Sequence, residues 1–186
     1  MASDPASAPP LFQEVLQSLQ RARTRPDVTL VEAPAPSRIA PYAIAIDGEV
    51  TSGEAEATGR FVVLHDPDGH EAWEGVLRIV ALVKAQVEDE VGADDMWSDV
   101  AWAWLGEALE GVPHHARGGT MTKVVSRSYG ELESRPSQVH VELRVSWTPE
   151  DGDLAPHIGA WTDLLATTAG VPPLPAGVSM LPGAAL

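Results

Sequence analysis

Residues 59–75, with the sequence GRFVVLHDPDGHEAWEG, show a strand–turn–strand pattern. The aliphatic and aromatic run at 61–64 favours a β-strand, because such side chains suit a half-buried pleated surface. The following Asp66-Pro67-Asp68-Gly69 predicts a turn. Proline presets φ, aspartate bonds the backbone two residues on, and glycine accepts a positive φ. We therefore expect a β-hairpin with strands over 60–65 and about 73–87.

A second extended pattern lies at 138–147, where apolar and polar residues alternate strictly. The apolar positions are Val139, Val141, Leu143, Val145 and Trp147, and the polar positions are His140, Glu142, Arg144 and Ser146. A period of two predicts a strand with one buried side and one side in water. A sheet built from such strands needs cover on one face only.

The other elements follow from spacing and from their end signals. Apolar residues at helical intervals predict helices over 11–22, 94–110 and about 153–170, with Asp94 or Asp95 capping the second and Asp153 the third. Further strands are expected at 28–32, 42–51 and 120–128, and a loop at 112–119. The fold class is therefore α+β, an antiparallel sheet of about six strands with three helices on one face, in the order α-β-β-β-β-α-β-β-α.

The length of 186 residues suits one domain, and 44% hydrophobic with 21% charged residues argues against general disorder. We expect a disordered tail at 1–9, a single domain at 10–170 and a proline-rich tail at 171–186. The sequence from Val171 to Pro175 favours polyproline II. Two alternatives stay open for this tail: it docks on its own domain, or it binds an aromatic groove of another protein.

The hairpin sequence resembles a family of actinobacterial proteins known as domain of unknown function 3000. Three later stretches fit the same family: Trp102–Leu105, Val145–Pro149, and Ala160–Trp161 continuing through Gly170–Pro175. The resemblance covers nearly the whole chain, and it implies a fold and a lineage but no activity. Members of the family are often encoded beside a ribonuclease of the D type, which implies a basic RNA-processing enzyme as a candidate partner. The element order also resembles that of bacterial secretion chaperones, which are small acidic binding proteins.

Composition excludes several classes of chemistry. The chain has no cysteine, so it has no disulfide, thiolate nucleophile or cysteine-based metal centre. Neither a signal-peptide pattern nor a membrane-spanning apolar run is present, since the longest aliphatic run is 79–83, and we expect a cytoplasmic protein. A net charge of −15 repels phosphate backbones and anionic lipids and so disfavours direct nucleic-acid binding. Only a local patch of Arg127, Arg135 and Arg144 could reverse that expectation.

The charge is uneven along the chain. Residues 85–116 contain no Lys or Arg but eight Asp and Glu residues. One interpretation is a solvated acidic helix, and the other is a docking face for a basic protein. In the second interpretation Glu88, Asp89 and Glu90 are binding residues.

No phosphate-binding loop, dinucleotide motif, zinc-protease motif or serine-hydrolase elbow is present. Five potential metal ligands fall within seven residues, namely His65, Asp66, Asp68, His70 and Glu71. Their spacing does not fit a calcium loop, and a hairpin turn accounts for the aspartates and the glycine. We therefore expect no metal, no cofactor and no catalytic set.

Histidine and tryptophan supply the remaining binding candidates. Trp73, just past the turn, and Trp102, at the edge of a helix face, could line the rim of an interface. We expect the tryptophans at 97, 104, 147 and 161 to pack in the core. The function expected is a non-catalytic protein-binding or regulatory module that acts through the acidic helix and the exposed sheet face. The alternative is a ligand-binding protein or enzyme, with a pocket between sheet and helices bordered by His65, Trp73 and His157.

Overall fold

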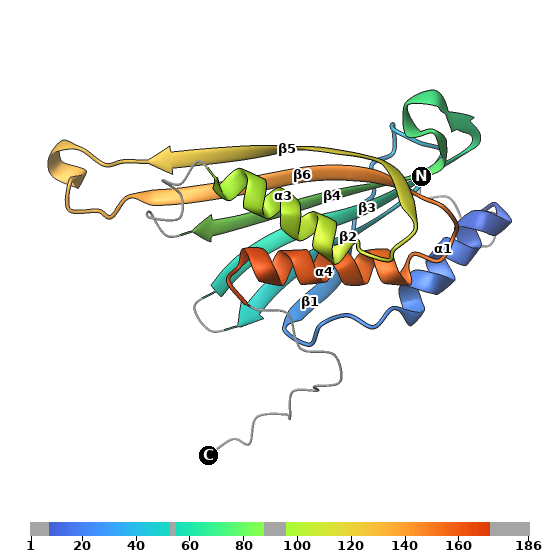
Figure 1. Ribbon diagram of the computed structural model, residues 1–186, viewed down its shortest axis with the longest axis horizontal. Helices are drawn as coiled ribbons and strands as arrows, with labels where there is room; N and C mark the ends of the chain where they lie inside the picture. The colour runs from blue at the N-terminus through green and yellow to red at the C-terminus, as the bar shows by residue number, and fades with distance from the viewer. Residues whose placement is uncertain (1–7, 53–54, 88–95, 172–186) are drawn as a thin grey trace, which may run out of the picture.

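A six-stranded sheet forms the centre of the computed structural model, which describes residues 8–52, 55–87 and 96–171 (Figure 1). The strand order is β1-β2-β3-β4-β6-β5, and every neighbouring pair is antiparallel. The strands are β1 (Val28–Ala33), β2 (Tyr42–Ser52), β3 (Ala55–His70), β4 (Gly75–Val87), β5 (His114–Ser126) and β6 (Gln138–Pro149). The predicted α+β class and element order are confirmed.

In the described part of the chain, three helices cover a single face of this sheet. They are α1 (Pro10–Arg21), α3 (Trp97–Ala108) and α4 (Ala155–Thr168). Helices α3 and α4 lie across the strands, and α1 packs at one end (Figure 1). Phe12 of α1 contacts Tyr42 and His65 on that same face, with ring centroids 5.8 and 5.9 Å away. Among the described residues, no helix is long and apolar enough to span a membrane.

The core lies between the sheet and the helices, and the alternation in β6 builds one wall of it. All five apolar residues predicted to face inward in this strand are buried, whereas His140 and Arg144 are exposed. Helix α4 supplies the opposite wall with Ile158, Trp161, Leu164 and Leu165. The period of two in the sequence therefore predicted the buried face correctly.

Trp161 fits into a slot made by two glycines. Gly48 and Gly59 are opposite each other in the β2–β3 register. A Cβ atom at Gly48 would lie 2.7 Å from the indole, and one at Gly59 would lie 2.9 Å from the indole and 2.4 Å from the Leu82 carbonyl oxygen. The indole Nε1 donates a hydrogen bond to that carbonyl at 3.2 Å. The absence of side chains at the two glycines thus determines how closely α4 approaches the sheet.

The hairpin reverses later than predicted. The expected turn chemistry is present, because Asp66 accepts a hydrogen bond from the Asp68 amide and Gly69 has φ +77°. These residues nevertheless extend β3, with a register shift between His65 and His70. The chain reverses at a 3₁₀ turn, Glu71–Trp73, followed by Glu74 at φ 55°. Pairing of His70 with Gly75 and capping of the turn by the His70 ring move the reversal beyond the Asp-Pro-Asp-Gly sequence.

Two other predicted boundaries need correction. The segment predicted as a loop at 112–119 enters β5 at His114, with a register shift between His115 and Gly118. Pairing with β6 there outweighs the weak local signal. Helix α3 begins at Trp97 and not at residue 94, and Val100, one of the apolar residues at helical intervals that predicted this helix, is 40% exposed. The predicted caps Asp94 and Asp95 lie outside the described residues, as do most of both predicted tails.

Candidate functional site

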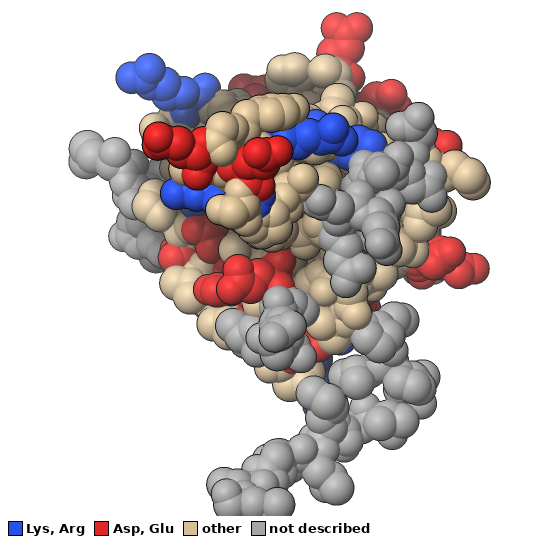
Figure 2. Space-filling model, turned by 90° about the vertical axis from the view of Figure 1, so that its left-hand side faces the viewer, with Lys and Arg blue, Asp and Glu red and all other residues tan. Residues whose placement is uncertain are grey.

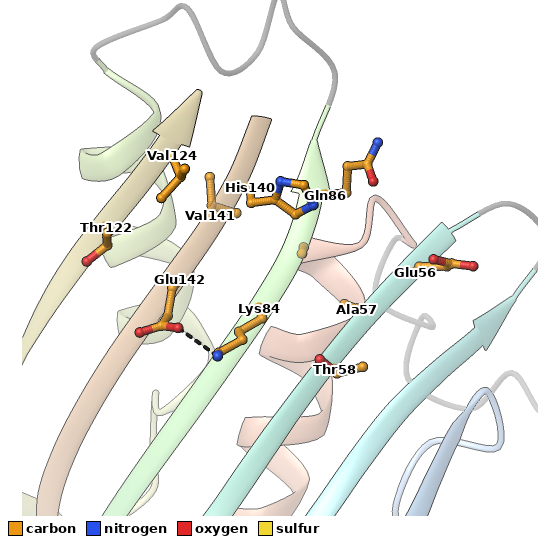
Figure 3. A pocket seen from close by; sticks show the side chains of 11 residues that line it. Glu56, Ala57, Thr58, Lys84, Gln86, Thr122, Val124, His140, Val141 and Glu142 are labelled. Carbon is orange, nitrogen blue, oxygen red and sulfur yellow. Dashed lines mark ion pairs between the residues drawn. The ribbon is translucent and has the colours of Figure 1, made fainter. Parts of the chain in front are cut away.

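The face of the sheet opposite the helices has no helix over it in the described part of the chain (Figure 1). The register places the even-numbered side chains of β3, β4, β6 and β5 on this outer face. Figure 3 shows Thr58, Lys84, Glu142 and Thr122 on these four strands, with the helices behind them. The polar residues of the alternating pattern therefore form an open surface.

Two adjoining hollows follow this surface across the strands. One has a volume of about 430 Å³ and the other about 500 Å³. Thr58 and Lys84 line both, so the hollows are continuous, and we call them together the sheet trough. Its other polar lining residues are Thr29, Asp47, Glu49, Glu56, Arg60, Gln86, Thr122, His140 and Glu142.

Two cations of the trough are paired with carboxylates on neighbouring strands. Arg60 donates two hydrogen bonds to Asp47, at 2.6 and 2.9 Å, and these hold the pKa of Asp47 below its usual value. Lys84 lies 2.9 Å from Glu142, which Arg144 also contacts, and the hydrogen bonds from these two cations lower the pKa of Glu142. Basic and acidic side chains also lie beside each other at the end where β5 and β6 are joined (Figure 2). The lining has four carboxylates, Asp47, Glu49, Glu56 and Glu142, against the two cations Arg60 and Lys84, so the trough keeps a net negative charge.

The two predicted histidines are buried in the core. The Nδ1 of His65 donates to the Val76 carbonyl at 2.9 Å, its ring stacks on Phe12, and its Nε2 has no hydrogen-bond partner. The Nδ1 of His157 accepts a hydrogen bond from Trp147 Nε1 at 3.0 Å. Burial is the main cause that lowers the pKa of His157 to about 4. This histidine is uncharged near neutral pH and is a weak base.

The predicted tryptophans are engaged within the chain. Trp73 is 9% exposed and stacks on His70 with ring centroids 4.9 Å apart. Trp102 is half-buried under the Arg117 guanidinium, whose carbon lies 5.1 Å from the ring centroid. Glu88, Asp89 and Glu90 lie outside the described residues. The predicted pocket residues His65, Trp73 and His157 do not line the trough or the apolar hollow of about 550 Å³ beside α1.

Comparison with known proteins identifies the family. The chain matches the family model described as DUF3000, protein of unknown function, over residues 8–179. It belongs to the DUF3000 family. This confirms the family that the hairpin and the three later stretches indicated. No curated protein and no solved structure matches the chain. The family has no assigned activity, so a function for this DUF3000 protein has to be argued from its own geometry.

Sequence reasoning missed most of the residues that line the trough of this DUF3000 protein. The polar side of the 138–147 pattern already contained His140 and Glu142, and it was predicted to face water. Their neighbours Lys84 and Thr122 become apparent only with the strand order, because β6 lies between β4 and β5. Within the described residues, no group of three or more His, Asp or Glu side chains is arranged to hold a metal ion.

Proposed function

We propose that this DUF3000 protein is a non-catalytic binding module that docks a protein partner in the sheet trough. The observation that carries the proposal is a sheet face that no helix of the described residues covers, on which charged side chains lie among exposed valines. Val31, Val80 and Val124 are 61%, 38% and 52% exposed on this face. Exposed apolar residues rimmed by polar ones are typical of interaction surfaces.

The shape of the trough favours a protein over a small molecule. Small-molecule sites are concave and bury most of the ligand, and a few polar groups converge in them. The trough is open to solvent along its length, and its two cations point to carboxylates on neighbouring strands and not to a common centre. An extended surface of this kind suits the flat contact area of a protein.

The two histidines predicted to border a pocket, His65 and His157, support a non-catalytic role. A general base needs a pKa near the working pH and reach to a substrate proton. His157 has a pKa of about 4, and its Nδ1 is occupied by Trp147. His65 lies in an aromatic cluster with Phe12 and Tyr42. Neither ring lines the trough.

Charge supports a basic partner, and an RNA-processing enzyme is the class that we propose. The trough lining has four carboxylates against two cations, and helix α3 on the opposite face adds Asp99 and Glu107 to the negative field of the molecule. Such a field accelerates the approach of a positively charged protein and suppresses nucleic-acid binding. Arg144, one of the three arginines that could have formed a nucleic-acid patch, is paired with Glu142.

The test begins with capture of partners from the native cytosol by the tagged full-length protein, at low and high salt. The protein identified is then purified, and its affinity for trough variants is measured by calorimetry. We expect Thr58→Arg and Thr122→Arg to weaken binding at least tenfold, because both side chains are exposed in the trough. Ala103→Arg is the matched control, since it adds the same side chain at an exposed position of α3. Equal affinities for all three variants would contradict the proposal.

A further inference from the structure

One end of the sheet concentrates the irregular backbone of the described chain. The two register shifts, between His65 and His70 and between His115 and Gly118, both lie there. Glu74 at φ 55° and Ala116 at φ 50° are the non-glycine residues with left-handed backbone in the described ranges. Bulges and strained residues are retained where they position a side chain, often at functional sites.

Arg78 connects these irregular segments. Its Nη1 donates to the Ala116 carbonyl at 2.8 Å and to Thr148 Oγ1 at 3.0 Å, and its Nη2 donates to Ser146 Oγ at 2.6 Å. The Thr148 hydroxyl in turn donates to the Trp73 carbonyl. The guanidinium is therefore held in one orientation by three oxygens from β5 and β6.

All three of these oxygens are neutral. The other cations of the outer face that the structure describes have carboxylate partners: Arg60 has Asp47, and Lys84 and Arg144 share Glu142. Arg78 forms no ion pair within the described residues. Burial lowers the pKa of Arg78, while the more distant Glu74 carboxylate opposes that change. A partly desolvated charge without a counter-ion is costly, and a ligand carboxylate would offset that cost.

We propose that Arg78, together with the Ser146 hydroxyl, binds an acidic side chain of the protein that docks in the trough. The three observed hydrogen bonds leave Nε–H and one Nη2–H, and such a pair suits the two oxygens of a carboxylate. Arg78 lies four residues from Leu82, which lines the trough, a separation of about 13 Å along a strand. The negative charge of Glu74, which acts on Arg78, favours a singly charged carboxylate over a doubly charged phosphate.

This inference rests on the proposed function, because the partner supplies the carboxylate. The net charge of the partner acts over a long distance, whereas the contact between Arg78 and the carboxylate acts only after docking. The overall field steers a basic protein toward the molecule, and one fixed arginine then determines the register of docking. A basic protein with an acidic residue at this position satisfies both requirements.

The first experiment tests the site without a partner. Full-length ¹⁵N-labelled protein is titrated with sodium acetate, with sodium chloride at equal ionic strength as the reference. We expect the Arg78 Nε–H resonance to shift saturably with acetate, while that of Arg60, already paired with Asp47, does not. Identical shifts in acetate and chloride would overturn the carboxylate site.

The second experiment uses the partner identified by capture. Arg78→Lys keeps the charge but loses the planar fork, and Arg78→Gln loses both. We expect each variant to bind the partner at least tenfold more weakly. The control Arg21→Gln, at an exposed position of α1 outside the trough, should bind the partner as the wild type does. Circular dichroism melts show whether each variant is folded. If a variant unfolds, the acetate titration of the wild type still tests the carboxylate site.

The two experiments separate the sources of the carboxylate. Saturable acetate binding with an unchanged partner affinity in Arg78→Gln would mean that the site takes a free small carboxylate, which overturns the assignment to a partner side chain. The variants Thr58→Arg and Thr122→Arg decide separately whether the trough binds the partner at all. A result against the Arg78 site therefore does not contradict the proposed function. Unchanged partner affinities of Thr58→Arg and Thr122→Arg would contradict the proposed function itself.

Discussion

At the scale of single residues, the buried His157 makes the stability of the fold depend on pH. Its ring accepts a hydrogen bond from Trp147 and is 2% exposed, and burial lowers its pKa to about 4. In the unfolded chain the pKa returns to about 6.5. Between these values the unfolded state binds a proton that the folded state does not, so stability falls as the pH drops from 6.5 toward 4 and this contribution levels off below 4.

The prediction concerns the slope of stability against pH. The full difference of about 2.5 pKa units corresponds to roughly 3 kcal/mol. His157→Asn keeps an acceptor for the Trp147 N–H but does not titrate, so we expect its stability to change less between pH 7 and pH 4.5. Urea unfolding at several pH values measures this, with His140→Asn on the exposed outer face as the control. Parallel curves for wild type and His157→Asn would show that His157 is not the titrating group.

At the scale of elements, the seating of α4 depends on two glycines of the sheet. Gly59 admits no side chain, because a Cβ there would approach the Leu82 carbonyl oxygen to 2.4 Å and the Trp161 ring to 2.9 Å. Relief of the first contact requires β3 and β4 to shift relative to each other, and relief of the second requires the Trp161 ring to move. Overpacking of this kind costs about 1 to 3 kcal/mol.

A pair of alanine substitutions with opposite expected signs tests this. Gly59→Ala should lower the free energy of unfolding by about 1 to 3 kcal/mol. Gly159→Ala, in α4 itself, meets no atom within 4 Å and should raise it by about 0.5 to 1 kcal/mol, because alanine is the better helix former. Chemical denaturation of both variants gives the two values. A neutral Gly59→Ala would mean that Trp161 does not depend on the slot.

The same scale shows why local sequence predicts some elements better than others. Strand β6 was predicted closely because the alternation of apolar and polar residues that indicates it lies within the strand itself. The start of β5 was missed because residues 114–119, HHARGG, carry no strand signal, and pairing with β6 orders them. The late reversal of the β3–β4 hairpin has the same cause, since the pairing of His70 with Gly75 lies outside the turn sequence.

At the scale of the whole molecule, the functional surface depends on strand order. Lys84 and Glu142, which form an ion pair, are 58 residues apart in the chain, and Arg60 and Asp47 are 13 residues apart. Arg78 reaches partners 38, 68 and 70 residues away. The sequence alone predicted a polar outer face, but it could not predict which polar residues become neighbours until β6 was placed between β4 and β5. Burial likewise removed His65 and His157 from any surface site.

Net charge acts on the whole fold as well as on its partners. With 27 acidic and 12 basic residues, the compact state concentrates a charge of −15, and this self-repulsion opposes folding. Salt screens such repulsion over about 10 Å at 0.1 M. The described exposed pairs, Arg60 with Asp47 and Lys84 with Glu142, lose at most about 1 kcal/mol each when screened. The repulsion among the excess acidic residues should therefore dominate the response to salt.

We expect the urea midpoint at pH 7.5 to rise when sodium chloride increases from 10 to 200 mM. Urea is suitable because it is uncharged and does not itself screen. The same measurement near the pI of about 4.6 is the control, because the net charge there is close to zero and the gain should disappear or change sign. A midpoint that falls with salt at pH 7.5 would mean that the ion pairs of the trough outweigh the general repulsion. The trough would then contribute more to the stability of the fold than its exposed position implies.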